Sequence, residues 1–218
     1  MRSNKTLHVV GILLCLTLFI PTRAQSDDVP RYEVGAQFTS ITKPDYSGGA
    51  TEAGFGGRFT FNFNRSLALE ATGNFFPHNC FSCGLSNGNI TQGLFGVKVG
   101  KRFQRWGIFG KARPGVVSFS KGEGRYEPTG GAGPFPFQFV QRRLTNFALD
   151  VGGVIEFYPS KRIVTRFEAG DTLIRYRSVN TNFVEIDGVT GVINLVPYTI
   201  PRHWTNNFQF MAGVGFRF

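Results

Sequence analysis

The last residues of the chain alternate strictly between apolar and small or polar side chains. Counting back from the terminal Phe218, apolar residues occupy every second position as far as Phe208. The positions between them hold Arg217, two glycines and Gln209, with Met211 as the exception. A period of two places each set of side chains on one face of a β-strand. Because the second face is mostly small or polar, the pattern predicts a strand whose apolar face meets lipid.

This ending resembles the C-terminal assembly signal of bacterial outer-membrane β-barrels, with Gly213, Phe216 and Phe218 at the matching positions. Met211 departs from the signal, where a polar residue is usual. The whole chain resembles the small barrels of the OmpA transmembrane-domain type. The resemblance implies an eight-stranded antiparallel up-and-down barrel in a bacterial outer membrane. It also implies recognition of the last strand by the barrel-assembly machinery.

The N-terminus predicts a cleaved secretory signal. Arg2 and Lys5 provide a positive start, residues 9–20 are apolar, and residues 22–24 resemble a signal-peptidase site. As a helix the apolar run would span about 18 Å, too short for a hydrocarbon core of about 30 Å. A signal at residues 1–24 is therefore favoured over a membrane anchor. Residues 25–218 are then expected to form one barrel domain.

Eight segments of the mature chain show the alternation expected of strands. In each segment, apolar side chains occupy one face, and glycine, charged or small polar side chains occupy the other. The segments are residues 31–40, 53–63, 67–75, 92–103, 106–119, 145–158, 163–177 and 203–218.

The connections between these segments alternate in length. Those at 41–52, 76–91, 120–144 and 178–202 are long, and those at 64–66, 104–105 and 159–162 are short. Small outer-membrane barrels have short periplasmic turns and long extracellular loops in this order. The alternation therefore predicts four extracellular loops, with both termini on the periplasmic side.

The polar face predicts a charged barrel interior. An eight-stranded barrel is just wide enough to be filled by side chains, and buried charges must be paired. We therefore expect a structural salt-bridge network that plugs the lumen; the alternative is a gated small-solute pore or proton path. The residues on inward positions are Arg58, Glu70, Lys98, Lys111, Arg113, Asp150, Glu156, Arg166 and Glu168.

Cys80 and Cys83 are the two cysteines left after removal of the signal. In an oxidising compartment they predict a disulfide that closes a tight loop. A thioredoxin-like redox site lacks the βα context that it needs. A zinc site would need two more ligands, for which His78 and His203 are the candidates. We expect no metal and no cofactor.

Catalysis has a precedent among small outer-membrane barrels, some of which modify lipid A. Such enzymes need a nucleophilic serine with a histidine near the outer leaflet. His78 and His203 lie in or beside the long loops, and neither matches the lipid A deacylase pattern of a histidine followed closely by Ser-Asn. We therefore predict no enzyme, and keep lipid A modification as an alternative.

The third long loop contains the glycine-rich stretch 130–137. Phosphate-binding glycine loops lie between a strand and a helix, and no helix is expected here. We expect a surface segment whose Phe135, Phe137 and Phe139 rest on the barrel rim or on lipid. Surface loops carry function on rigid scaffolds, so adhesion or ligand binding through the loops is the second functional hypothesis.

The net charge of +10, about +7 without the signal, does not indicate nucleic-acid binding, because the basic residues are scattered. Anionic lipopolysaccharide is a more natural partner than nucleic acid for the exposed Lys and Arg side chains. A soluble lipocalin-like barrel would place the apolar face inside around a ligand, and is the alternative fold. The sequence therefore predicts a monomeric outer-membrane barrel with a structural or surface-interaction role.

Overall fold

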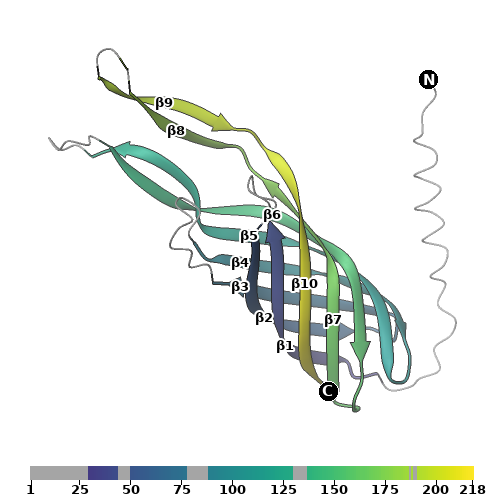
Figure 1. The fold of residues 1–218 in the computed structure, drawn as a ribbon. Coiled ribbons are helices and arrows are strands. Elements are labelled where there is room, and N and C mark those ends of the chain that lie inside the picture. Colours follow the sequence, from purple (N-terminus) through teal and green to yellow (C-terminus); the bar gives the residue numbers. More distant parts are fainter. Residues whose placement is uncertain (1–28, 44–49, 78–87, 130–136, 187, 189–190) are drawn as a thin grey trace, which may run out of the picture.

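The computed structural model describes residues 29–43, 50–77, 88–129, 137–186, 188 and 191–218. These residues form ten β-strands (Figure 1). No helix among them is long and apolar enough to cross a membrane. The strand bounds are β1 Tyr32–Lys43, β2 Ala50–Asn62, β3 Leu67–Phe76, β4 Ile90–Arg102, β5 Trp106–Pro128, β6 Phe137–Phe157, β7 Ile163–Tyr176, β8 Val179–Ile186, β9 Ile193–Ile200 and β10 His203–Arg217.

Eight of these strands form a closed antiparallel barrel in the order β1-β10-β7-β6-β5-β4-β3-β2. The barrel closes where β1 pairs with β10, with Val34 opposite Phe216 and Gln37 opposite Gly213. Beyond the strand, Phe218 and Tyr32 exchange two backbone hydrogen bonds of 2.9 Å. The fold class predicted from the sequence is confirmed, and the three residues of the predicted assembly signal lie along the closing seam.

The outer wall of the barrel is apolar and the inner wall is polar. Within the barrel wall, outward side chains alternate with buried ones along the strands, as in β3 with its outward Leu67 and Phe75 and inward Glu70 and Asn74. A soluble lipocalin-like barrel has the opposite arrangement, so that alternative is wrong. The exposed apolar side chains of the wall include Val34, Phe38, Phe55, Phe59, Phe95, Val97, Ile108, Val116, Phe147, Ile155, Phe167, Phe208, Val214 and Phe216.

One end of the barrel, here called the turn end, carries the three short connections after β2, β4 and β6 together with Phe218. Side chains close two of these turns: Asn64 Oδ1 accepts hydrogen bonds from the amides of Ser66 and Leu67 at 2.7 and 2.8 Å. Ser160 Oγ accepts one from the amide of Ile163 at 3.1 Å. Asparagine and serine stabilise tight turns in this way, which explains why the four residues 63–66 and the five residues 158–162 suffice to reverse the chain.

The opposite end, here called the hairpin end, carries the long connections predicted at 120–144 and 178–202, and the structure shows β-strands within both of them. Strands β5 and β6 continue beyond the barrel and stay paired as far as Pro128 opposite Phe137, after a register shift between Phe119 and Glu123. Strands β8 and β9 pair with each other as a second hairpin, from Val179 opposite Ile200 to Ile186 opposite Ile193. Both hairpins extend away from the barrel (Figure 1). The apolar alternation of the wall is lost in Lys121–Pro128, because neither face of a projecting hairpin meets lipid.

Candidate functional site in the lumen and at the hairpin end

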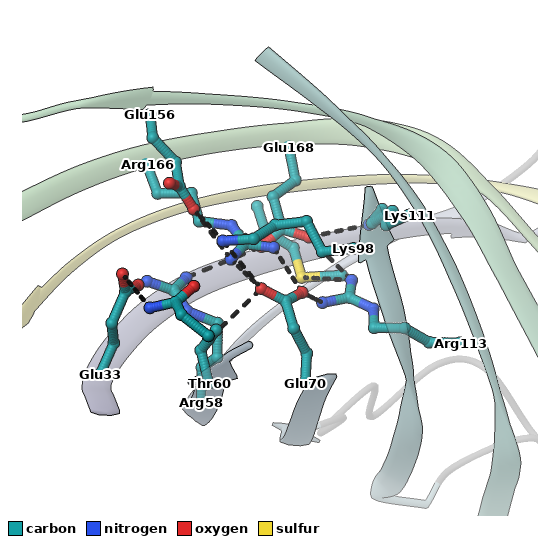
Figure 2. A network of polar contacts seen from close by, with 12 residues as sticks. Glu33, Arg58, Thr60, Glu70, Lys98, Lys111, Arg113, Glu156, Arg166 and Glu168 are labelled. Atoms are coloured by element: carbon teal, nitrogen blue, oxygen red, sulfur yellow. Dashed lines mark hydrogen bonds and ion pairs between the residues drawn. The ribbon is translucent and has the colours of Figure 1, made fainter. Parts of the chain in front are cut away.

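All nine charged residues expected on the polar face lie inside the barrel, at 5% exposure or less. They project from β2, β3, β4, β5, β6 and β7, and Figure 2 shows how all of them except Asp150 lie toward one another. The strand period places them there: each occupies an inward position between two outward, mostly apolar or small residues. Buried charges of both signs must be paired, and the structure pairs them in two adjoining groups.

Glu70 is the centre of the first group. Both nitrogens of the Arg166 fork bind its carboxylate, with Nη2 at 2.7 Å from Oε2. Lys98 Nζ and Arg113 Nη1 lie at 3.4 Å from the same carboxylate. Lys98 also donates to Glu156 Oε1 at 2.5 Å and so joins two carboxylates. Glu70 is the acceptor on which three cations converge.

Glu168 and Asp150 form the second group around Arg113 and Lys111. Arg113 Nη2 donates to Asp150 Oδ2 at 2.5 Å and to Glu168 Oε2 at 2.7 Å. Lys111 Nζ lies at 3.0 and 2.9 Å from the same two atoms. Because Arg113 also reaches Glu70, the two groups form one continuous network, here called the charge layer.

Arg58 belongs to this layer but has weaker pairing. Its Nη1 lies at 3.7 Å from Glu168 Oε1, which is an ion pair without a short hydrogen bond. Its guanidinium lies against Gly35 and Gly215, where a Cβ atom would come within 3.2 and 3.5 Å of Nη2. The absence of side chains at these two positions makes room for the guanidinium.

Sequence reasoning missed three charged residues at the turn end of the lumen. Glu33 accepts from Arg102 Nη2 at 3.4 Å, and Arg217 Nε lies at 3.3 Å from the same Oε1 atom. Arg102 Nε donates to the Tyr158 hydroxyl at 2.9 Å, and that hydroxyl donates to Glu156 at 2.8 Å. The alternation could have found all three, because each lies on the inward phase of its strand.

A layer of amides lies next to the charge layer, toward the hairpin end. Gln37 Nε2 donates to Asn74 Oδ1 at 2.8 Å, and Asn74 Nδ2 donates to Gln92 Oε1 at 2.6 Å. Gln92 and Gln209 exchange hydrogen bonds at about 3 Å. Met211, which departs from the assembly signal, is buried here and contacts Gln37 Nε2 through its sulfur at 3.4 Å.

An apolar cluster lies inside the barrel toward the hairpin end. The inward residues of β3 show the sequence of layers, from Glu70 through Asn74 to Phe76, which is fully buried. Phe119 and Tyr176 pack on the cluster and stack on each other at 5.8 Å. The buried members are Ile41, Phe76, Ile90, Leu94, Val117, Ala148 and Ile174.

Side chains join the two hairpins above this cluster. Asn182 of β8 donates to the carbonyl of Tyr126 in β5 at 2.9 Å, and its Oδ1 accepts from the amide of Tyr126 at 2.7 Å. Thr181 Oγ1 donates to the carbonyl of Gly124 at 2.6 Å. Asn182 thus satisfies both backbone groups of one residue at the edge of β5, as a neighbouring strand would.

Aromatic side chains line a cavity of about 700 Å³ between the hairpins and the barrel rim. Phe119 and Tyr176 form its floor, and Tyr126, Phe139 and Phe183 come from the hairpins. Phe139 packs on Tyr126 at 5.1 Å, and therefore does not lie on the rim or on lipid as expected. The cavity combines an apolar wall with a few polar groups, as ligand sites do.

The other predicted sites have mixed outcomes. Cys80, Cys83, His78 and the signal segment lie outside the described residues. His203 is exposed, stacks on Tyr176 at 4.9 Å and contacts the carbonyl of Pro201 at 3.1 Å through Nδ1. Among the residues that the structure describes, no group of three or more His, Cys, Asp or Glu side chains could hold a metal ion.

No protein-family model and no curated protein matches this sequence. Among solved structures, Neisserial surface protein A is similar at 13% identity and a TM-score of 0.52, over 86% of this chain and 97% of that chain. Ail, the attachment invasion locus protein of Yersinia pestis solved with the heparin analogue sucrose octasulfate, is similar at 12% identity and a TM-score of 0.45, over 86% and 97%. The N-terminal β-barrel domain of Pseudomonas aeruginosa OprF is similar at 10% identity and a TM-score of 0.39, over 84% and 97%.

At such low identity, the likeness to the Neisserial protein shows a shared fold. The outer wall of the barrel carries exposed apolar side chains on most of its strands, and such a wall is typical of a barrel surrounded by lipid. The fold and this surface together confirm the predicted location in a bacterial outer membrane.

Proposed function

We propose that this chain, an eight-stranded barrel with the fold of small outer-membrane barrels, is a closed scaffold that presents a binding surface outside the cell. The turn end faces the periplasm and the hairpin end faces outward. The observation that carries the proposal is the double hydrogen bond between Asn182 and Tyr126, because it joins the two hairpins into one unit. That unit, here called the hairpin head, comprises residues 120–128, 137–144, 179–186 and 193–200.

The hairpin head has the features of an interaction surface. Phe183, Ile186, Tyr198 and Ile200 are exposed on it, although it lies beyond the lipid-facing wall. Exposed apolar groups next to an aromatic cavity are typical of interaction sites. Ordered hairpins also present such groups at a lower entropic cost than irregular loops would.

The lumen supports a structural role rather than transport. The charge layer, the amide layer and the apolar cluster follow one another along the barrel axis, and each contains side chains from several strands. An eight-stranded barrel leaves little room beyond its side chains. The small-solute pore is therefore the less favoured function. Reconstitution of the purified protein into planar bilayers tests it, and ohmic conductance from the wild type would contradict a closed lumen.

Lipid A modification has less support. A hydrolase of that kind needs a histidine that can activate a serine nucleophile. The contacts that the structure shows for His203 are with Tyr176 and with the carbonyl of Pro201. Incubation of the purified barrel with lipid A and mass spectrometry of the products tests for an enzyme, and a changed acyl pattern would contradict the proposal.

Binding experiments test the hairpin head directly. A variant that replaces residues 181–198 by a short glycine-serine turn removes most of β8 and β9 and leaves the barrel strands intact. Cells that display wild type or variant are tested on lipopolysaccharide and on fibronectin, with unheated and boiled gel mobility as the control for barrel folding. We expect the variant to fold and to lose binding to one of these surfaces. Wild-type binding to neither surface, or equal binding by both proteins, would contradict the proposal.

The remaining partners follow from the same scaffold. We expect the barrel-assembly machinery to recognise β10, whose Gly213, Phe216 and Phe218 match the assembly signal. We expect a monomer, because the barrel leaves no sheet edge unpaired in its wall. Lipids and lipopolysaccharide are the surroundings of the outer wall.

A further inference from the structure

A large basic cavity lies at the turn end of the barrel, at the opposite end of the molecule from the hairpin head. Its volume is about 1300 Å³. Arg102 and Arg217 lie at its inner side, and Arg65, Arg105 and Lys161 come from the three short turns. Each short turn therefore contributes one cation to the same cavity.

Acidic groups near the cavity are fewer and already paired. Glu33 is fully buried and accepts from Arg102 and Asn62, and Glu156 is fully buried and contacts Lys98 and Arg102. The lining residues that the structure describes include no Asp or Glu. A surplus of positive charge therefore faces the cavity, and such a surplus attracts small anions.

Arg102 supplies a second, independent indication of a ligand. Its side chain is only 6% exposed, and its four hydrogen bonds use Nε and Nη2. Nη1 is buried and has no hydrogen-bond partner among the described residues. An unpaired donor on a buried guanidinium costs free energy unless a ligand or water binds it. Arg102 is one of the residues that line the cavity, so an anion bound there would lie beside this guanidinium.

The rim of the cavity also belongs to the lipid-facing wall. Phe103 and Trp106 line the cavity and stack on each other at 4.3 Å. The Lys101 ammonium lies over the Phe103 ring, 5.4 Å from its centroid. Aromatic rings of this kind lie at the membrane interface, at the depth of the lipid phosphates.

We propose that this cavity is a phosphate-binding site, filled by the headgroup of a phospholipid or by a free phosphate. Arginine is suited to this ligand because its planar fork binds two phosphate oxygens at once. Arg105 and Lys161 hold the phosphate at the rim, and Arg102 donates to it from the wall. The site lies on the periplasmic side and is separate from the surface proposed for the hairpin head.

The two tryptophans of the chain allow a direct test. Trp204 lies in β10 near the hairpin end, so W204F leaves Trp106 in the cavity wall as the single reporter. The full-length W204F protein in a non-ionic detergent is titrated with inorganic phosphate and, separately, with dihexanoyl phosphatidylglycerol. We expect a saturable change in Trp106 fluorescence with at least one of them. Tighter binding of the lipid indicates a headgroup site, and equal or tighter binding of inorganic phosphate indicates a free anion.

Charge variants locate the binding. R105Q/K161Q in the W204F background removes two rim cations, and R143Q/R202Q removes two exposed cations at the hairpin end as the matched control. Each basic residue near an anionic group contributes roughly a five-fold change in affinity, so we expect about a 30-fold loss for the rim variant and none for the control. R102K keeps the charge and removes the guanidinium, and it should weaken binding if gel mobility shows a folded barrel.

Two outcomes would overturn the site. The proposal is wrong if neither probe gives a saturable change in Trp106 fluorescence at millimolar concentrations. It is also wrong if R105Q/K161Q and R143Q/R202Q lose equal amounts of affinity.

Discussion

Glutamate is paired with arginine in two regions of this molecule, in opposite surroundings. In the lumen, Glu70 and Arg166 are both fully buried. In the β5–β6 hairpin, Glu127 accepts from Arg125 at 2.6 Å and from Arg142 at 2.9 Å, and these side chains are 29%, 37% and 52% exposed. The hydrogen bonds are of similar length, so the two regions differ mainly in access to water.

Access to water decides what each pair does. Ions inside the barrel have lost their hydration, so each depends on its partners, and removing one partner leaves a buried charge uncompensated. Ions on the hairpin keep much of their hydration, and pairs of this kind contribute little to stability. The charge layer therefore fixes how the barrel wall closes around it, while the pairs on the hairpin are dispensable.

The largest effect is expected when the central carboxylate of the charge layer is removed. Glu70→Gln removes the carboxylate on which three cations converge, and we expect a loss of about 3–5 kcal/mol in the free energy of unfolding. Urea unfolding of the barrel in lipid vesicles, followed by Trp fluorescence, measures it. Glu127→Gln is the matched control, because it makes the same change beside two arginines on the hairpin. Equal stabilities of the two variants would contradict the role assigned to burial.

The seam between β1 and β10 allows a smaller test of the wall. A Cβ atom on Gly213 would come within 2.5 Å of the Ala36 carbonyl oxygen and within 2.8 Å of the Gln37 Cβ. We expect Gly213→Ala to cost about 1–3 kcal/mol, as overpacking does. Gly153→Ala is the control, since nothing lies within 4 Å of its Cβ position. A lower melting temperature of the unheated gel band is expected for the first variant only.

The link between the hairpins is expected to have a local effect. Asn182→Ala leaves the amide and the carbonyl of Tyr126 without their partners in the link. We expect about 1 kcal/mol of local destabilisation, which is roughly a five-fold faster hydrogen exchange at the Tyr126 amide. The barrel's melting temperature should not change. Asn194→Ala, at an exposed position of β9, is the control. An equal increase in hydrogen exchange at the Tyr126 amide in this variant would contradict the role assigned to Asn182.

The sequence predicted the barrel well because lipid imposes a simple rule on its wall. Outward residues such as Phe59 must be apolar and inward residues such as Arg58 must be polar or small, so the period of two is strong. The predicted lumen residues all lie on the inward side for the same reason. Lipid does not constrain the side chains of the hairpin head in this way. Its two hairpins are joined by contacts such as that between Asn182 and Tyr126, which lie 56 residues apart in the sequence. Such a contact leaves no periodic pattern, which is why strands β8 and β9 were expected to be loops.

The smallest expected effect is a pH dependence confined to the hairpin head. The Arg125 hydrogen bond holds the pKa of Glu127 below its usual value. A depressed pKa means that the interaction is complete at neutral pH and is lost only as pH falls through the lowered pKa, in the acidic range below the usual pKa of a glutamate carboxyl. We therefore expect the Arg125 and Arg142 side chains to gain mobility in that window, as measured by NMR relaxation of their Nε groups. Glu127→Gln should show the same mobility already at neutral pH. In the same titration the unheated protein should keep the gel mobility of the folded barrel, because the Glu127 pairs lie outside the barrel wall. If the folded band were lost over the same pH range in which the arginine side chains gain mobility, the hairpin pairs and the wall would be coupled and the prediction would be wrong.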